Sequence, residues 1–241
     1  MRLNLYLAKC GVASRRGADK IINEGRVLIN GAPALVGASV EDGDIVELDN
    51  QVITPQSDTI VLAVNKPIGV VCTEAHFKGE KTLSKLINYP TRVFGIGRLD
   101  KDSEGLILMT NDGTLAQEIS KSANAHEKEY EVRVEKPVTA EFLEAMRGGV
   151  DIVLDDDAHN GQVVTTRPCK VRKLDAYTFR IILTQGFNRQ IRRMVRALDY
   201  HVRSLKRIRV MSVELGDLKS GSYRQLSPDE ISELIKATKS K

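Results

Sequence analysis

The sequence predicts an α+β fold built on a mixed, mainly antiparallel sheet. Strand-like segments outnumber helical ones, and "KEYEVRVEK" alternates cleanly between apolar and polar residues, as a half-buried strand does. Most connections between these strands are too short to hold a crossover helix, which disfavours a parallel sheet. A hydrophobic content of 41% and a charged content of 28% over 241 residues are ordinary for a globular protein.

The first part of the chain, residues 1–49, predicts a small domain of two helices followed by a hairpin. "RLNLYLAKCG" has apolar residues at helical spacing, and "SRRGADKIINEG" begins after Ser14, a favourable N-cap. Short β-like pieces then run to Leu48. Residues 50–59 are polar, contain Pro55 and are predicted to be a linker to a second domain, residues 60–241.

The second domain begins with the strands "IVLAVNKP" and "IGVVCT", and "RVFGIGRLD" leads into the strand "GLILMTN". Helix patterns follow at "GTLAQEISKS" and at "TAEFLEAMRGG", where Thr139 is the expected N-cap. An acidic turn lies within "VDIVLDDDAHNGQVV". Two strands, a basic helix, a long strand and a final helix complete the domain, at "CKVRKL", "YTFRIILTQG", "NRQIRRMVRALDY", "VRSLKRIRVMSVEL" and "SPDEISELIKATK".

Several classes of protein are disfavoured by the composition. No run of about 18 apolar residues is present, and the N-terminus is too polar for a secretory signal. The three cysteines, Cys10, Cys72 and Cys169, lie far apart, so we expect reduced thiols and a cytoplasmic protein. None of the four histidines forms a ligand pair, and no metal site is expected.

The net charge of +4 conceals two basic clusters. Residues 2–26 hold two acids against six basic residues, Arg2, Lys9, Arg15, Arg16, Lys20 and Arg26. Residues 186–209 hold only Asp199 against eight basic residues, Arg189, Arg192, Arg193, Arg196, Arg203, Lys206, Arg207 and Arg209. Two such clusters in a nearly balanced chain favour a polyanionic partner such as nucleic acid, with two solvated faces as the alternative.

Asp100 is the first candidate for chemistry, because it lies in a turn between Gly97 and Gly105, ahead of an apolar strand. Glycines at such positions let the backbone approach another molecule closely. A plain turn residue is the simpler interpretation. A glycosidase is another, but it would use two carboxylates about 5–10 Å apart, whereas Asp102 and Glu104 share one short loop with Asp100.

Tyr130 and the basic helix are the other candidates. Tyr130 shares the core face of its strand with Val132, so its ring is either core packing or a platform for a base. On the helix, Arg192 lies four residues before Arg196, and Arg189 four before Arg193. One such pair can meet phosphates while another points inward to a carboxylate; an RNA-facing helix without a catalytic part is the alternative.

Together these motifs resemble a known family. "RLNLYLAKCGVASRRGADKIINEGRVLINGAPA" resembles the S4 RNA-binding domain, whose fold is the small α-L arrangement. "NKPIGVVCT", "GIGRLDKDSEGLILMTNDG", "KEYEVRV" and "GFNRQIRRM" resemble, in order and spacing, the successive motifs of bacterial ribosomal RNA pseudouridine synthases that carry an S4 domain. "RVFGIGRLDKDSEGL" and "NAHEKEYEV" are most similar to the subfamily called 23S rRNA pseudouridine synthase F.

The resemblance implies a role for each candidate. Asp100 would break the uridine C1′–N1 bond, after which the base turns and rejoins through C5; attack at C1′ and proton removal at C2′ both remain open. Tyr130 would stack on the flipped base, and Arg192 would pair with Asp100 and keep it ionised. Arg98 would help to displace the base, with Leu99 and Ile208 in the pocket wall. No cofactor is implied, because the product is an isomer.

The implied partner is a stem-loop of 23S ribosomal RNA, bound by a monomer, with 16S RNA or a tRNA as alternative substrates. The expected RNA contacts are Arg2, Lys9, Arg15, Arg16, Lys20, Arg26, Lys66, Arg189 and Arg193. A non-catalytic S4-type protein, such as a ribosome-rescue factor, would explain the first fifty residues equally well. It would not explain why Asp100, Tyr130 and Arg192 occur at the spacing of the synthase motifs.

Overall fold

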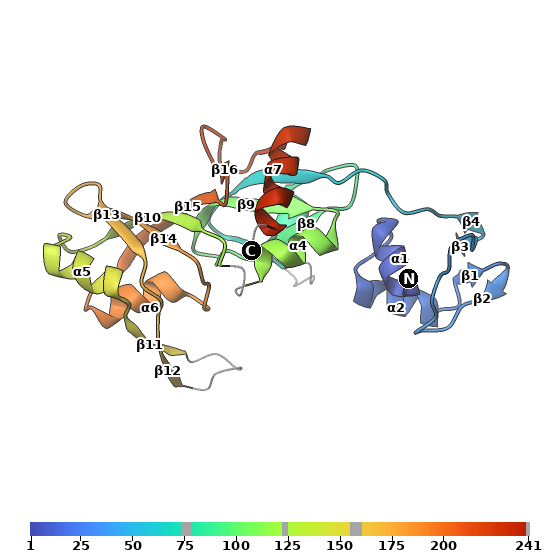
Figure 1. Ribbon diagram of the computed structural model, residues 1–241, viewed down its shortest axis with the longest axis horizontal. Coiled ribbons are helices and arrows are strands. Elements are labelled where there is room, and N and C mark those ends of the chain that lie inside the picture. The colour runs from blue at the N-terminus through green and yellow to red at the C-terminus, as the bar shows by residue number, and fades with distance from the viewer. Residues whose placement is uncertain (74–78, 122–124, 155–160, 240–241) are drawn as a thin grey trace. The chain divides into compact units, whose positions relative to one another are not determined.

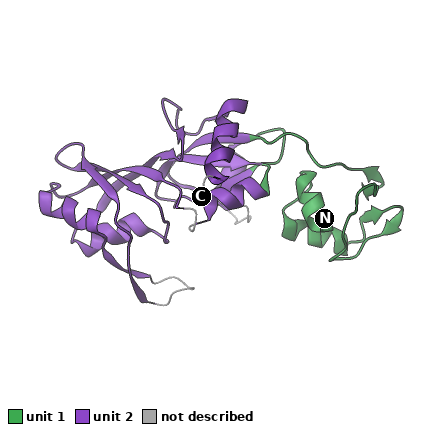
Figure 2. Cartoon of the chain, viewed as in Figure 1, with its two compact units in different colours: residues 1–60, 89–93, 111–113 green, residues 61–88, 94–110, 114–241 purple. Residues whose placement is uncertain are grey.

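A computed structural model describes residues 1–73, 79–121, 125–154 and 161–239. The chain divides into two compact units, shown in different colours in Figure 2. Unit 1 comprises residues 1–60 together with the short segments 89–93 and 111–113. Unit 2 comprises residues 61–88, 94–110 and 114–241.

Unit 1 contains the two helices and the small sheet expected from its sequence. Helix α1 is Leu3–Lys9 and helix α2 is Arg15–Asn23. The Ser14 hydroxyl accepts a hydrogen bond from the Gly17 N–H at 3.1 Å, which confirms this residue as the N-cap of α2. A four-stranded sheet has the order β2-β1-β3-β4, with bounds Ala32–Pro33, Val27–Ile29, Val46–Leu48 and Gln51–Val52. Strand β4 therefore lies within the segment predicted to be a linker.

Unit 2 is built on a nine-stranded sheet (Figure 1). Its main path runs β13-β14-β10-β15-β9-β5-β17, while β16 pairs with β15 and β8 with β9. Among these pairs only β15 and β9 run parallel, so the mixed, mainly antiparallel sheet is confirmed. The strands are β5 Val61–Lys66, β8 Phe94–Ile96, β9 Glu104–Thr110, β10 Lys128–Val134, β13 Lys170–Lys173, β14 Thr178–Leu183, β15 Val202–Val210, β16 Val213–Glu214 and β17 Tyr223–Gln225.

Helices and two small strand pairs complete unit 2. They are α3 Leu83–Leu86, α4 Gly113–Ser120, α5 Ala140–Gly148, α6 Gln190–Ala197 and α7 Pro228–Lys239, with β6 Val70–Val71 beside β7 Lys81–Thr82 and β11 Asp151–Leu154 beside β12 Gln162–Thr165. The strand predicted at 202–215 is divided by a turn at Met211, whose φ is +53°. The predicted acidic turn falls on 155–160, outside the described residues.

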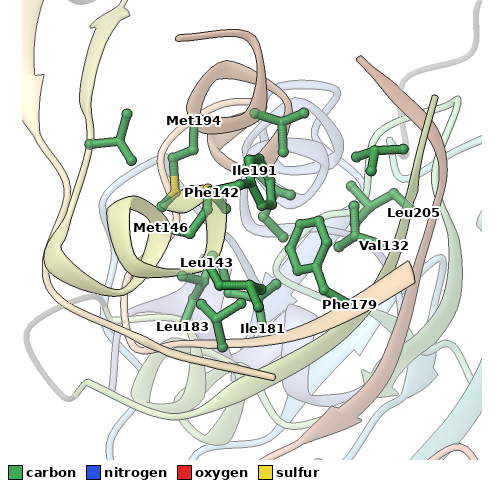
Figure 3. Packing of buried hydrophobic residues seen from close by; sticks show 14 of the residues in the cluster. Val132, Phe142, Leu143, Met146, Phe179, Ile181, Leu183, Ile191, Met194 and Leu205 are labelled. Atoms are coloured by element: carbon green, nitrogen blue, oxygen red, sulfur yellow. The ribbon is translucent and has the colours of Figure 1, made fainter. Parts of the chain in front are cut away.

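Two hydrophobic clusters lie along this sheet. In the first, α5 and α6 pack on strands β10, β14 and β15, and Figure 3 shows Phe142 and Met194 among the residues from these helices and Phe179 and Val132 among those from the strands. In the second, α4 and α7 pack on β5 and β9, with Leu115 and Leu234 among the helix residues that contribute. The strands between the two clusters carry the site described next.

No helix in the described part of the chain is long and apolar enough to cross a membrane. The same residues contain no group of three or more His, Cys, Asp or Glu side chains placed to hold a metal ion.

Candidate active site

A pocket of about 400 Å³ lies between the two hydrophobic clusters of unit 2. Residues 96–100 and Ser103 line one side, and residues 185–191 line the other. Strands β10 and β15 contribute Lys128, Tyr130, Leu205, Arg207 and Val210. Asp100 and Tyr130 therefore meet in one pocket, where Asp100 is the only carboxylate among the described lining residues. Arg98 and Leu99 also line it.

The Asp100 loop follows β8 and is held mainly through its backbone. The Ser103 N–H donates to the Asp100 carbonyl at 3.1 Å, and the Gly69 N–H donates to the Lys101 carbonyl at 2.7 Å. Leu99 is 8% exposed, and its N–H donates to the Cys72 Sγ at 3.4 Å. Because the loop is held in this way, the Asp100 carboxylate is free to face the pocket.

Lys66 supports this loop from inside the protein and cannot contact RNA as the sequence suggested. Its side chain is fully buried, and its Nζ donates to the carbonyls of Val70 at 2.8 Å and Pro67 at 3.0 Å. Burial lowers the pKa of Lys66, while the nearby Cys72 and Asp100 act in the opposite direction. A lysine enclosed at the end of β5 has no free ammonium to offer a phosphate.

Gly105 brings the Asp100 loop close to β15. It has a φ of +102° and lies opposite Arg207 in the parallel pair of β9 with β15. A Cβ atom at Gly105 would lie 2.3 Å from the Arg207 carbonyl oxygen, a distance that no side chain tolerates. Glycine is therefore required here by both conformation and space.

Arg192 differs from its expected placement, because its ion pair is with Asp102 and not with Asp100. The Arg192 Nη2 lies 3.4 Å from the Asp102 carboxylate and donates to the Asp102 carbonyl at 2.8 Å. Arg189 binds the same carboxylate at 3.0 Å. Burial tends to raise the pKa of Asp102, but the Arg189 hydrogen bond and the charges of both arginines bring it below its ordinary value. The basic helix thus clamps the loop two residues beyond Asp100.

Ile208 does not line the pocket, which corrects the expected wall position. In the pairing of β10 with β15, Tyr130 lies opposite Arg207 and Glu129 lies opposite Arg209, so Ile208 is the extra residue of a β-bulge. The bulge shifts the alternation by one residue. As a result Leu205, Arg207 and Val210 face the pocket from β15.

The predicted RNA contacts of unit 1 fall into two groups. Lys9, Arg15, Arg16 and Lys20 are exposed. Arg26 is also exposed, but it is bound to Asp49 at 2.6 Å and to Glu24 at 3.3 Å. Arg2 donates to the Gly37 carbonyl at 2.5 Å. In unit 2, Arg193 donates to the carbonyls of Asn188, at 2.9 Å, and Val153.

Two cationic residues of the pocket, Lys128 and Arg207, were not singled out as site residues from the sequence. Arg207 lies 6.0 Å from the centre of the Tyr130 ring and is 3% exposed. Lys128 precedes Tyr130 by two positions and so shares its face of β10. The alternation of apolar and polar residues that placed Tyr130 on one face of the strand also places Lys128 on that face. Arg207 was one of eight basic residues at 186–209, and no local pattern marked it as a pocket residue.

Comparison with known proteins assigns both parts of the chain. Residues 60–197 match the family of RNA pseudouridylate synthases, and residues 1–46 match the S4 domain. A crystal structure of a pseudouridylate synthase superposes with a TM-score of 0.68 at 28% identity, covering 97% of this chain and 99% of that one. The pocket therefore lies in an RNA-modifying enzyme that carries an S4 domain.

The chain belongs to the RNA pseudouridylate synthase family and converts uridine in RNA to pseudouridine. The dual-specificity RNA pseudouridine synthase RluF of Escherichia coli (strain K12) is 44% identical over 239 residues, 98% of this chain and 79% of that protein. The ribosomal large subunit pseudouridine synthase B of Bacillus subtilis (strain 168) is 32% identical over 241 residues, 97% of this chain and 95% of that protein.

Proposed function

We propose that this enzyme isomerises a uridine in a stem-loop of 23S ribosomal RNA, acting as a monomer in the cytoplasm, with a tRNA as a second substrate. Support comes from the 44% identity to a relative named a dual-specificity RNA pseudouridine synthase. A second relative is named for the large ribosomal subunit. The other candidate substrate, 16S RNA, is an outcome of the experiment below.

Asp100 is the proposed catalytic carboxylate, and one observation carries this assignment. Asp100 and Tyr130 come from separate elements yet line the same pocket, and no second carboxylate lines it among the described residues. A glycosidase would need that second group. A single carboxylate beside an aromatic ring instead suits a reaction in which the base leaves the sugar and returns, by attack of Asp100 at C1′ or by proton removal at C2′.

Tyr130 is the proposed platform for the flipped base. A duplexed uridine must leave its stack before the reaction, at a cost of a few kcal/mol. Stacking on an aromatic ring recovers about 1–3 kcal/mol of that cost. Arg98, exposed at the pocket rim, is placed to occupy the space that the base vacates.

Arg192 is proposed to position Asp100 by holding Asp102. The two arginines on the Asp102 carboxylate fix the loop from the side of α6, while the hydrogen bonds described above fix it from the side of β6. A carboxylate held in this way need not reorganise when the substrate enters.

The S4 unit is proposed to supply the phosphate contacts that give affinity and register. The exposed cations of α2 and its surroundings, Lys9, Arg15, Arg16 and Lys20, form no ion pair in the described part of the chain. Contacts of this kind bind RNA largely without reading its sequence.

The test is pseudouridine mapping by carbodiimide treatment and primer extension on 23S, 16S and tRNA substrates. Each RNA is incubated with wild-type protein or with Asp100→Asn. A new stop in 23S RNA with wild type alone supports both the substrate and the role of Asp100. A stop only in 16S RNA rejects the substrate and keeps the chemistry, whereas a stop that survives Asp100→Asn rejects the assigned carboxylate.

A further inference from the structure

The pocket holds two cations that the proposed chemistry has not yet used, Lys128 and Arg207. They are placed by the pairing of β10 with β15, in which Arg207 lies directly opposite Tyr130 and Lys128 is two residues from Tyr130 on the same face. Both line the pocket that contains Asp100. Two positive side chains thus lie beside the ring on which the base would stack.

Neither cation has a carboxylate partner among the described residues. The Arg207 Nε donates to the Leu106 carbonyl at 2.6 Å, and its Nη1 donates to the Arg98 carbonyl at 3.4 Å. The Lys128 Nζ donates only to the His126 carbonyl, at 3.4 Å. Burial, with the Arg207 charge adding to it, lowers the pKa of Lys128 to about 8. Unpaired buried charges cost free energy, and they are typical of functional sites.

Conversion of uridine to pseudouridine produces an anion, the detached uracil, in this pocket. When the C1′–N1 bond breaks, its electron pair leaves with the uracil, whose negative charge spreads over N1 and the carbonyl oxygens. The anion turns, its C5 forms a bond to C1′, C5 then loses a proton and N1 gains one. The product is an isomer of the substrate, so no other reactant is consumed.

We propose that Lys128 and Arg207 form a cationic floor that binds the detached uracil anion and stabilises it while the base turns. This inference rests on the proposed function, because it takes Asp100 and Tyr130 as the groups around the base. Lys128 is then a catalytic residue that acts on the leaving group. A fixed positive charge that is partly buried stabilises developing negative charge better than it would in bulk water.

A backbone phosphate is the other anion that the two cations could meet, and the pocket walls argue against it. The apolar side chains of Leu99, Ile191 and Leu205 line the same pocket, as suits a flat base. Phosphates have another, more strongly cationic site on α6, where a groove is lined by Arg189, Arg192, Arg193, Arg196, Tyr200, His201 and Val202. We therefore expect the base, and not a backbone phosphate, to contact Lys128 and Arg207.

The experiment compares wild type with Lys128→Met, Lys128→Arg and the control Lys219→Met, an exposed lysine of the same unit. The RNA carries tritium at C5 of uridine, and its release is measured in single turnover, together with the RNA dissociation constant. Lys128→Met is expected to slow release by about 10²–10³-fold while changing the dissociation constant less than about threefold. Lys128→Arg is expected to recover most of the rate, and Lys219→Met to match wild type.

The pH profile separates charge stabilisation from a structural role. The charged and titratable groups that line the pocket around Lys128 are Arg98, Asp100, Tyr130, Arg189 and Arg207. Since the ammonium form is the active one, the wild-type rate falls above pH 8 as Lys128 loses its proton. Lys128→Arg, which alters only this group, is expected to lose that falling limb.

Three results would overturn the inference: an undiminished rate in Lys128→Met, a loss confined to RNA binding, or a falling limb unchanged in Lys128→Arg. If Lys128→Met does not fold, the pH profile of Lys128→Arg decides alone. A wild-type protein that releases no tritium from any of the RNAs would reject the proposed function instead, so the two failures are distinguishable.

Discussion

The two faces of the β10–β15 pair differ in whether their cationic side chains have carboxylate partners. On the face away from the pocket, Arg209 binds Glu129 at 3.1 Å and Glu127 at 3.0 Å, and Arg180 lies 3.5 Å from Glu131. On the pocket face, Lys128 and Arg207 form side-chain hydrogen bonds only to backbone carbonyls among the described residues. Carboxylates are thus plentiful on these strands, but they are absent from the face where a substrate anion must be received.

Unit 1 shows the same contrast on its surface. Arg26 is neutralised by Asp49 and Glu24, whereas Arg15 at the start of α2 is exposed and forms no ion pair in the described part of the chain. A cation that is already paired with carboxylates is less able to neutralise an RNA phosphate, so it displaces fewer of the counterions condensed on the RNA. Counting basic residues in the sequence therefore overstates the cations available for RNA.

The most severe test removes Asp100, which lies on the loop after β8 and is the only carboxylate among the described residues that line the pocket. Asp100→Asn is expected to lower the single-turnover rate by at least about 10⁴-fold, because it removes the carboxylate that we propose to open the C1′–N1 bond. RNA affinity is expected to stay within about threefold of wild type, since binding is dominated by phosphate contacts. Tritium release and filter binding measure the two quantities, and a residual rate above one-hundredth of wild type would contradict the assignment.

Asp102→Asn tests a carboxylate at the edge of the pocket and has a smaller expected effect. The rate is expected to fall roughly 10- to 100-fold, because the Asp100 loop loses the clamp from Arg189 and Arg192. Asp217→Asn, an exposed aspartate, is the control. Equal rates for the two variants would show that the clamp does not position Asp100.

The clamp also has a pH dependence whose sign follows from the lowered pKa of Asp102. A carboxyl group whose pKa is lower in the folded protein stabilises it above the ordinary value of about 3.9 and loses that contribution as the pH falls. The clamp is therefore intact through neutral pH and is lost in acid. Thermal melting of wild type and Asp102→Asn is expected to converge below pH 4.

On the opposite face, Glu129→Gln should change stability and spare the chemistry. Glu129 is 14% exposed and its loss leaves the Arg209 guanidinium short of a partner, so the free energy of unfolding is expected to fall by about 1–2 kcal/mol. The more exposed Glu131→Gln is the control, with an expected loss under about 0.5 kcal/mol. Urea denaturation gives both values, and the tritium-release rate should stay within about twofold of wild type.

The smallest effect is expected in unit 1. Arg15→Gln should reduce the slope of log affinity against log salt by about 0.7–0.9, the contribution of one phosphate contact. Arg26→Gln should leave the slope unchanged, because Asp49 and Glu24 already occupy that guanidinium. Filter binding over a salt series makes the comparison, and equal slopes for the two variants would contradict it.

The fold and the order of its elements could be predicted from local patterns. Periodicity located α2 and α5, and their caps at Ser14 and Thr139 have the expected hydrogen bonds. Alternation in "KEYEVRV" placed Tyr130 on the same face as the buried Val132. These inferences depend only on neighbours in sequence, which is why they succeed.

Three features could not be predicted, because each depends on contacts between distant segments. Arg192 pairs with Asp102 and not with Asp100 because of the way in which the loop after β8 contacts α6. That loop has no periodic pattern from which the contact could be predicted. The position of Ile208 depends on a bulge, which shifts the alternation by one residue without any mark in the sequence. The burial of Lys66 follows from the carbonyls that enclose its ammonium, and a basic residue at the end of a strand normally predicts exposure.

The parallel contact of β9 with β15 rests on two residue pairs, Lys206 with Glu104 and Arg207 with Gly105. The Arg207 side chain and the Leu106 carbonyl that it binds are 101 positions apart in the chain. Closing so long a loop is slow and comes late in folding. During synthesis on the ribosome, the pocket of unit 2 therefore cannot form until β15 has emerged, and a nascent chain that ends before β15 lacks Arg207 and the other pocket residues of that strand.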